Sequence, residues 1–334
     1  MAFLLSGSPM IVQLHCKGPT GKVSRMRAVF GVCMILILIP RLGAAVVIRK
    51  IEGYSRAILK QDCRKPMPLS TEHRAMPDLP EVFICKTAFA AVAGRSHLQT
   101  PAPRQHVAAR ASNGVTCIAL ADGADGADRS DIGVQVAVTA ALAYVCKNFE
   151  SLWQNMDKHN AKAAQRLVHR CLDALRRKSA KVGCSINDLT CSLAFVACSQ
   201  GRYMAGHLGA GVIVSVDAEG KLATLSPPEN TESGRTRVFL TDPKAVSKLG
   251  LYRGPIEAPA GFAILSNGAA HSLFQPAGTT AAPTVLNFLE LNATSPRKKF
   301  KAVLAEKLQQ STASESADDC ALGLMSILRR DVSA

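Results

Sequence analysis

Apolar and polar segments alternate clearly from Glu81 to the end of the chain. The segments Glu81–Val92 and Val115–Ala121 are short, apolar and rich in β-branched or small residues, which is typical of buried strands. Asp122 and Gly123 end the second segment, and a polar loop follows. Ile132–Tyr144 is then apolar and rich in alanine, so we expect a buried helix there. The pattern therefore predicts a carboxylate at the end of a buried strand, just before a helix.

The rest of this region has more strand-like than helix-like segments. Ser151 to Lys181 is amphipathic and basic, which predicts a helix with a solvated basic face. Consecutive strands of one continuing sheet are expected at Leu189–Cys198, Arg202–Leu208 and Gly211–Val216. Further strands are expected at Lys221–Leu225, Val238–Thr241, Gly261–Leu265 and Cys320–Leu328, and further helices at Pro243–Leu249, Val285–Leu291 and Lys299–Gln309. Strand hairpins grouped with helices favour a layered α+β fold over alternating βαβ units.

Residues 1–80 differ from the rest of the chain. Val29–Ile39 is strongly apolar, and Leu42–Ile48 is apolar again after Pro40 and Arg41. The uninterrupted run is shorter than the ~20 residues of a membrane-spanning helix. Three interpretations stay open: an appended buried or poorly ordered segment, a membrane contact through residues 28–48, or a cleaved secretory signal. Because Cys63–Pro80 has linker composition, the expected domains are an N-terminal extension with linker, residues 1–80, and one larger domain, residues 81–330.

The net charge and the cysteine content indicate which kinds of binding partner and which cellular compartment to expect. The net charge is +15, from 40 Lys and Arg against 25 Asp and Glu, and residues 1–80 contribute over half of this excess. No basic-and-aromatic pattern or zinc-finger spacing is present, which argues against specific nucleic-acid recognition. The 11 cysteines lie mostly in apolar runs without a C-x-x-C pair. We therefore expect reduced thiols and a cytoplasmic protein, with membrane association through the N-terminal apolar segment as an alternative.

Five stretches follow one another in a fixed order along the expected domain. They are Gly94–Arg110, Val115–Gly133, Gly206–Val216, Gly261–Ala269 and Asp318–Ser326. In this order and spacing they resemble the bacterial branch of the metal-dependent protein phosphatases, the PPM or protein phosphatase 2C family. That family usually shows Q-D, A-D-G-A-G-S, G-D-G, S-D-G and D-D or D-N. The resemblance implies two antiparallel sheets packed face to face as a sandwich, with helices outside.

The resemblance also implies a chemistry. Members of the family hydrolyse phosphoserine and phosphothreonine in proteins with two Mn²⁺ or Mg²⁺ ions that activate a water. Carried over by motif, the metal ligands are Asp122, Gly123, Asn267 and Asp318, with His106 and Asp319 as candidate peripheral ligands. The implied partners are a phosphorylated protein or a partner serine/threonine kinase.

Three acidic positions of the family pattern are changed in this chain. His106 stands in place of the Q-D aspartate, Ala210 in place of the G-D-G aspartate, and Asn267 in place of the S-D-G aspartate. Losing three negative charges should weaken divalent-metal binding by an amount on the order of several kcal/mol. The nearby acids Asp125, Asp128 and Asp131 are expected to be solvated.

Two functional hypotheses follow from these departures. In the first, the chain is a phosphatase with weak activity that depends on Asp122 and Asp318. In the second, it is a pseudophosphatase that keeps the fold and binds a phosphoprotein or partner kinase without turnover.

Overall fold

The computed structural model describes most of the chain after Val82 and a few strands before it. The described ranges are 10–17, 23–30, 37–38, 45–46, 82–95, 105–156, 160–227, 237–258, 260–275, 280–281, 283–313 and 316–330. The chain divides between Met76 and Pro77 into two compact units. In the first unit β1 (Met10–Lys17) pairs with β2 (Val23–Phe30), and β3 (Ile37–Leu38) pairs with β4 (Ala45–Val46). The candidate membrane segment, residues 28–48, therefore contains strand residues, and its remaining residues lie outside the described ranges.

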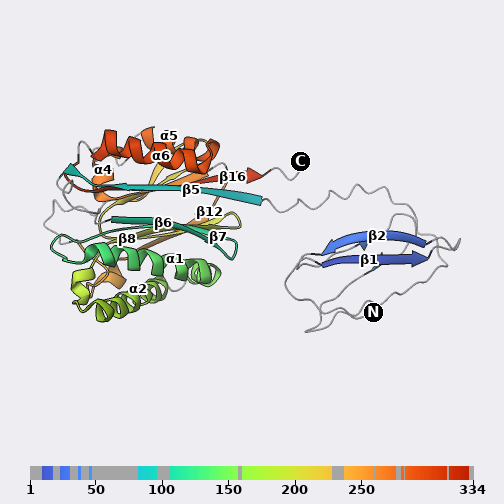
Figure 1. Ribbon diagram of the computed structural model, residues 1–334, viewed down its shortest axis with the longest axis horizontal. Coiled ribbons are helices and arrows are strands. Elements are labelled where there is room, and N and C mark those ends of the chain that lie inside the picture. The colour runs from blue at the N-terminus through green and yellow to red at the C-terminus, as the bar shows by residue number, and fades with distance from the viewer. Residues whose placement is uncertain are drawn as a thin grey trace. The chain divides into compact units, whose positions relative to one another are not determined.

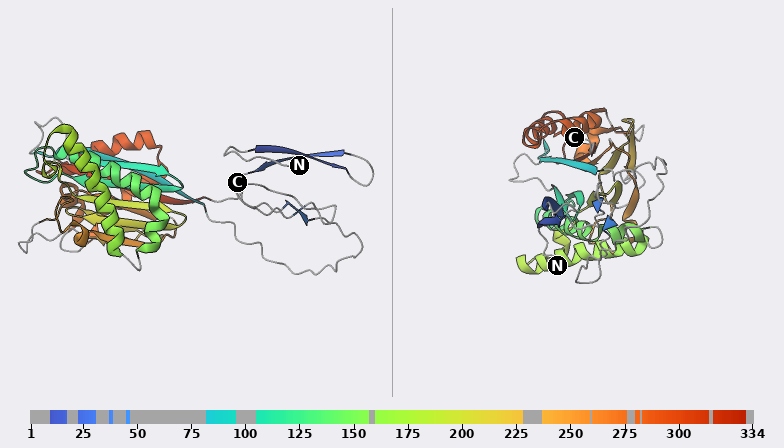
Figure 2. Two further views of the ribbon diagram at one scale, coloured as in Figure 1. Left: turned by 90° about the horizontal axis from the view of Figure 1, so that it is seen from below. Right: turned by 90° about the vertical axis from the view of Figure 1, so that its right-hand side faces the viewer.

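Two antiparallel five-stranded sheets form the centre of the second unit, and helices cover their outer surfaces (Figure 1; Figure 2). One sheet has the order β11-β10-β13-β16-β5 and the other the order β12-β9-β8-β7-β6. The strands are β5 (Val82–Val92), β6 (Gln105–Ser112), β7 (Val115–Asp122), β8 (Leu193–Ser199), β9 (Arg202–Leu208), β10 (Val212–Val216), β11 (Leu222–Ser226), β12 (Gly250–Pro255), β13 (Ala260–Leu265) and β16 (Cys320–Arg330). A short ribbon, β14 (Phe274–Gln275) with β15 (Thr280–Ala281), lies outside the two sheets. The predicted α+β sandwich is confirmed.

Each sheet has its own helical layer. The helices α1 (Ser130–Asn155) and α2 (Asn160–Val182) cover the sheet that contains β7, and α4 (Asn267–Leu273), α5 (Pro283–Thr294) and α6 (Arg297–Lys307) cover the sheet that contains β16. Shorter helical turns are Ile186–Leu189, α3 (Ala245–Lys248) and Leu308–Ala313. Among the described helices only α1 is long and apolar enough to cross a membrane, and half of that apolar window is buried within the domain.

Strand alternation divides the core into three apolar layers. On β7, Cys117 and Ala119 pack against the α1 layer, whereas Ile118 and Leu120 pack between the sheets. A third cluster fills the space under α5 and α6. Successive side chains on a strand point to opposite faces, so a residue's parity decides which layer it enters. The cysteines among the described residues of the second unit are free thiols.

Several elements differ from the prediction. Gly211–Val216 does not continue the sheet of β9, because the turn Gly209–Gly211 carries the chain into the other sheet. Gly209 and Gly211 have φ values of +90° and +111°, which glycine adopts without strain. The expected strand Val238–Thr241 is irregular chain, although its Leu240 N–H donates to the Cys191 carbonyl at 2.9 Å.

The helix expected from Ser151 to Lys181 consists of two elements. Its first residues belong to the end of α1, and α2 begins at Asn160. The strands β6 and β12 were not predicted. The β12 segment, G-L-Y-R-G-P, has two glycines and a proline, which weaken the strand signal although the segment pairs fully with β9 at the sheet edge.

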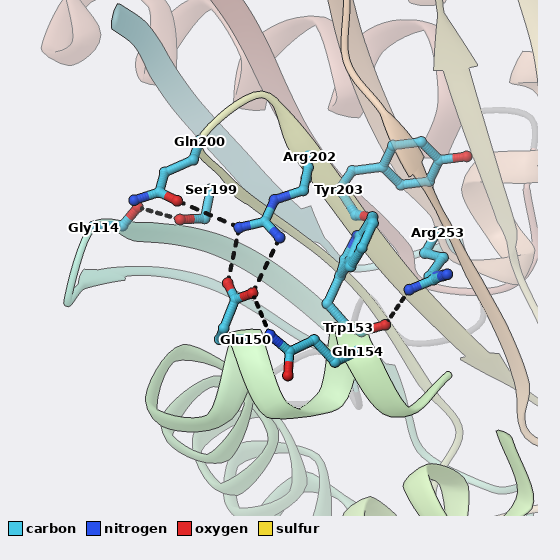
Figure 3. A network of polar contacts seen from close by, with 9 residues as sticks. All are labelled: Gly114, Glu150, Trp153, Gln154, Ser199, Gln200, Arg202, Tyr203 and Arg253. Atoms are coloured by element: carbon cyan, nitrogen blue, oxygen red, sulfur yellow. Dashed lines mark hydrogen bonds and ion pairs between the residues drawn. The ribbon is translucent and has the colours of Figure 1, made fainter. Parts of the chain in front are cut away.

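A polar network around Trp153 attaches the end of α1 to β9 and β12 (Figure 3). The guanidinium carbon of Arg253 lies 4.0 Å from the centroid of the indole ring, and that of Arg202 lies 4.9 Å away. The indole Nε1 donates to the Tyr203 carbonyl at 3.2 Å. Arg202 also donates to both carboxylate oxygens of Glu150, at 3.1 and 2.8 Å, and Arg253 donates to the Trp153 carbonyl. The end of α1 is thus held by both cation–π and hydrogen-bond contacts.

Replacing Arg253 by methionine should loosen this attachment. The variant loses the nearer cation–π contact and a donor to the main chain, so we expect a loss of about 1–2 kcal/mol in unfolding free energy. Trp153 is the chain's single tryptophan, so the fluorescence emission reports on this side chain alone. The emission should shift to the red as the loosened indole becomes more exposed to water. Arg177→Met, an exposed change on α2, is the matched control. Unchanged stability and emission in Arg253→Met would contradict this account.

Candidate metal centre

Asp122, Asn267 and Asp318 come from three separate segments and meet at one end of the sandwich. Asp122 is the last residue of β7, Asn267 is the first residue of α4, and Asp318 lies just before β16. The Asn267 Nδ2 donates to Asp318 Oδ2 at 3.3 Å. Burial is the main cause of the raised pKa of the Asp122 carboxyl, and the negative charges of Asp318 and, to a lesser extent, Asp319 act on it in the same direction. The structure thus brings together three of the four residues predicted as metal ligands, and Gly123 directly follows Asp122.

The Asp122 carboxyl is a buried acid without a nearby cation among the described residues. Burial raises its pKa well above the ordinary value, and the charge of Asp318 adds to this shift. A hydrogen bond from Gln105 acts in the opposite direction. The main chain is fixed by Ser192: the Asp122 N–H donates to Ser192 Oγ at 2.9 Å, and the Ser192 N–H donates to the Asp122 carbonyl at 2.8 Å. A rigid backbone thus holds a carboxyl whose ionisation needs a positive partner.

The strand register places Gln105, not His106, on the same side as Asp122. Gln105 lies directly opposite Asp122 in the β6–β7 ladder, and His106 lies opposite Ala121. Gln105, like Val107 two residues later, therefore faces the space between the sheets, and His106 faces the α1 layer. Burial alone lowers the pKa of His106. The candidate peripheral ligand at His106 consequently points away from the Asp122 carboxyl.

Asp319, the other candidate peripheral ligand, fixes the surrounding backbone. Its side chain is buried, and Oδ1 accepts a hydrogen bond from the Gly94 N–H at 3.0 Å. Its carbonyl accepts a hydrogen bond from Gln105 Nε2 at 2.7 Å. A Cβ on Gly94 would lie 2.1 Å from the Asp318 carbonyl oxygen, and one on Gly268 would lie 2.2 Å from that of Asp319. Close backbone approach explains why glycine occupies these two motif positions.

Ser266 builds the start of α4 independently of the residue that follows it. Its buried Oγ accepts hydrogen bonds from the Ala321 N–H at 2.9 Å and from the Ala269 N–H at 3.4 Å. The second contact is a helix N-cap, which satisfies an otherwise unpaired donor of the first turn. Asn267 is thereby held beside Asp318 by the main chain, so the S-N-G frame keeps its shape with an amide in place of a carboxylate.

The turn at Ala210 also keeps its shape without an acid. Its carbonyl lies 3.3 Å from His207 Nε2, and His207 Nδ1 lies 2.7 Å from Ser226 Oγ. Tyr252 donates its hydroxyl to the same Ser226 oxygen at 3.2 Å. Burial lowers the pKa of His207. Sequence reasoning did not identify Gln105, Ser192 or His207, because a buried polar partner leaves no periodic signal.

The donor set at this end of the sandwich is incomplete for two ions. Gly123 forms an isolated backbone β-bridge with Cys191, which is a buried core residue. The loop acids are exposed, as predicted for Asp125, Asp128 and Asp131, although the charge of Asp125 contributes to the raised pKa of Asp122. Among the described residues, no group of three or more His, Cys, Asp or Glu is arranged to hold a metal ion.

Comparison with known proteins identifies the family. A model of the protein phosphatase 2C family matches residues 93–309, which is more than half of the chain. The chain belongs to the protein phosphatase 2C family. No match was found among curated protein sequences. The motif resemblance in the sequence is therefore confirmed at the level of the family.

Solved structures of bacterial serine/threonine phosphatases share the fold. The catalytic domain of the serine/threonine protein phosphatase PstP in complex with two manganese ions has a TM-score of 0.53 at 16% identity, covering 74% of this chain and 100% of that one. The S. agalactiae serine/threonine phosphatase has a TM-score of 0.50 at 15% identity, covering 73% and 99%. A bacterial serine phosphatase in which one arginine is replaced by glutamate has a TM-score of 0.52 at 9% identity, covering 74% and 99%. At these identities the likeness concerns the fold.

Proposed function

We propose that this chain is a protein phosphatase 2C family protein that hydrolyses phosphoserine or phosphothreonine in proteins only slowly. The observation that carries the proposal is the hydrogen bond from the Asn267 amide to Asp318. In this arrangement an N–H group faces a carboxylate oxygen that the family pattern assigns to a cation. A neutral amide offsets much less negative charge than a divalent ion does. The negative charge of Asp122 and Asp318 is therefore only partly compensated.

The residues present fit a weakly bound Mn²⁺ or Mg²⁺ ion. Asp122 and Asp318 would provide two carboxylates, and the carbonyl oxygens of Asn267 and Gly123 would provide neutral ligands. Gln105 Oε1 is buried without a hydrogen-bond partner among the described residues, as expected where a water or an ion belongs to the site. A bound divalent ion would neutralise phosphoryl oxygens and activate water. The chain's own residues would hold that ion at the end of the sandwich.

A second candidate function is binding without turnover. The same Asn267 amide contact favours it, because the donor neutralises part of the Asp318 charge in the absence of any metal. The partner in this case would be a phosphorylated protein or a serine/threonine kinase. The fold would then present a binding surface, and the remnant centre would have no chemical role.

A phosphate-release assay on the full chain separates the two functions. Slow turnover of a phosphoserine or phosphothreonine peptide, faster with Mn²⁺ than with Mg²⁺ and lost in Asp122→Asn, would support the weak enzyme. Peptide binding with no release above the Asp122→Asn background would support the binding module. Turnover on the order of 1–100 s⁻¹ by the wild-type chain would refute the proposed impairment.

A further inference from the structure

A cleft lies at the edge of the sandwich, away from the candidate metal centre. The edge strands of the two sheets, β5 and β6, are in contact with each other, and α6 packs on β5. Between these elements is a cavity of about 480 Å³. One of its lining residues, Thr116, precedes Asp122 by six positions on β7, which corresponds to roughly 20 Å along the strand. The cavity is therefore separate from the candidate metal centre.

Small side chains from the edge strands form the floor of this cleft. Cys85 and Ala109 belong to the layer between the sheets, and by strand alternation Thr87, Ala111 and Thr116 face the same space. Aromatic residues fill this layer further along, as at Phe89. The small residues leave room where the two sheet edges meet, and two of them carry hydroxyl groups that can donate hydrogen bonds.

The rim of the cleft is cationic. Lys86, Arg110 and Arg297 line it from both sides, and the lining contains no Asp or Glu. Lys86 is held in place, since its Nζ donates to the Ala293 carbonyl and its own carbonyl accepts a hydrogen bond from the buried Asn292 Nδ2 at 2.9 Å. Arg110 and Arg297 are exposed, and no carboxylate of the described residues forms an ion pair with either. By strand alternation Lys86 and Arg110 lie on the outer faces of β5 and β6, so the three positive charges border the cavity, and its lining has no anion to balance them.

The start of α6 adds to this positive potential. Its N-cap residue, Pro296, provides no side-chain hydrogen bond, and the first turn contains no acidic residue. The sequence there is Arg297, Lys298 and Lys299, three cations at the positive end of the helix dipole. This arrangement is electrostatically unfavourable by itself. A bound anion would relieve the repulsion among these three cations. It would also accept hydrogen bonds from the N–H groups of the first turn, which have no partner within the helix.

We propose that this cleft binds a small, soluble ligand that carries phosphate groups. Guanidinium groups match phosphate oxygens in paired hydrogen bonds, and the hydroxyls of Thr87 and Ser295 can contact further oxygens. The cavity volume lies within the range of small-molecule sites. Binding here uses none of the metal-ligand candidates, so the proposal is independent of phosphatase activity.

The test is calorimetric titration of the full chain with inorganic pyrophosphate in the presence of a chelator, which removes any metal-dependent phosphate binding. The double variant Arg110→Gln/Arg297→Gln should bind pyrophosphate at least about tenfold more weakly than the wild type. The control Lys162→Gln/Arg177→Gln removes two exposed charges from α2 and should bind within about twofold of the wild type. Circular dichroism of both variants serves to check that the fold is retained.

Two results would overturn the proposal. One is the absence of pyrophosphate binding by the wild type at low ionic strength. The other is an equal loss of affinity in the cleft variant and the α2 control, which would show attraction to overall positive charge. A parallel titration with ADP distinguishes the sources of phosphate. Tighter binding of ADP would assign a nucleotide to the cleft, and tighter binding of pyrophosphate would assign a ligand recognised through phosphate alone.

Discussion

Replacing Asn267 by aspartate is expected to raise Mn²⁺ affinity about 10- to 100-fold and to raise phosphopeptide turnover with it. The substitution changes an N–H donor that faces Asp318 Oδ2 into a third carboxylate beside Asp122 and Asp318. The added charge strengthens attraction to a divalent ion by about 1.4–2.8 kcal/mol in a partly desolvated site. Because Ser266 caps the helix through its own side chain, position 267 should keep its place in the variant.

Titration with Mn²⁺ and phosphate release from a phosphoserine peptide measure the two effects. His106→Asp is the matched control, since it adds the same charge on the α1 side of β6 and should change Mn²⁺ affinity by less than about threefold. Ala210→Asp should have an intermediate effect, because it restores a charge at the periphery of the centre. If His106→Asp were as effective as Asn267→Asp, position 106 and not position 105 would face the Asp122 carboxyl. A folded Asn267→Asp variant with unchanged affinity would show that the centre lost more than its ligands.

The motif positions near Asp122 could be predicted because local sequence encodes them. An apolar run that ends in Asp and Gly before an alanine-rich helix predicts a strand, a carboxylate and a helix without long-range information. The local sequence does not show on which face of the strand the neighbouring side chains lie. Gln105 and His106 exchange roles if the pairing of β6 with β7 moves by one residue, and only the register decides between them.

The assignment of strands to sheets also depends on long-range contacts. The sequence between β9 and β10 is a plain glycine-containing turn, yet the chain changes sheets there. The apolar segment Val238–Thr241 predicts a strand, but it is irregular chain in which Val238 and Leu240 are buried. Conversely, β12 pairs fully with β9 in spite of its glycines and proline. Local propensity is overridden in each case by packing against elements distant in the sequence.

Replacing Asp122 by asparagine should have opposite effects on the metal-free and the metal-bound protein. Without metal, the buried carboxyl lies beside Asp318 and its pKa is raised well above the ordinary 3.8. Such a group stabilises the fold fully below its unfolded pKa, and that stabilisation is lost as the pH rises through the folded pKa. The isosteric amide carries no charge at any of these pH values. We therefore expect Asp122→Asn to be more stable by about 1–3 kcal/mol at pH 7 in chelator, with a weaker decline of stability between acid and neutral pH.

With excess Mn²⁺ the order should reverse, because a ligand that binds only the folded state stabilises it in proportion to the logarithm of its concentration over Kd. The wild type should gain thermal stability with added Mn²⁺, whereas Asp122→Asn should gain little. Thermal unfolding between pH 4 and 8, with chelator and with Mn²⁺, measures both effects, and exposed Asp125→Asn is the control expected to change neither strongly. A metal-free Asp122→Asn protein that is less stable than the wild type would mean that hydrogen bonds such as the one from Gln105 outweigh burial and charge repulsion at this carboxyl. In that case the centre would be a polar network adapted to its own residues, and the second candidate function, binding without turnover, would be favoured.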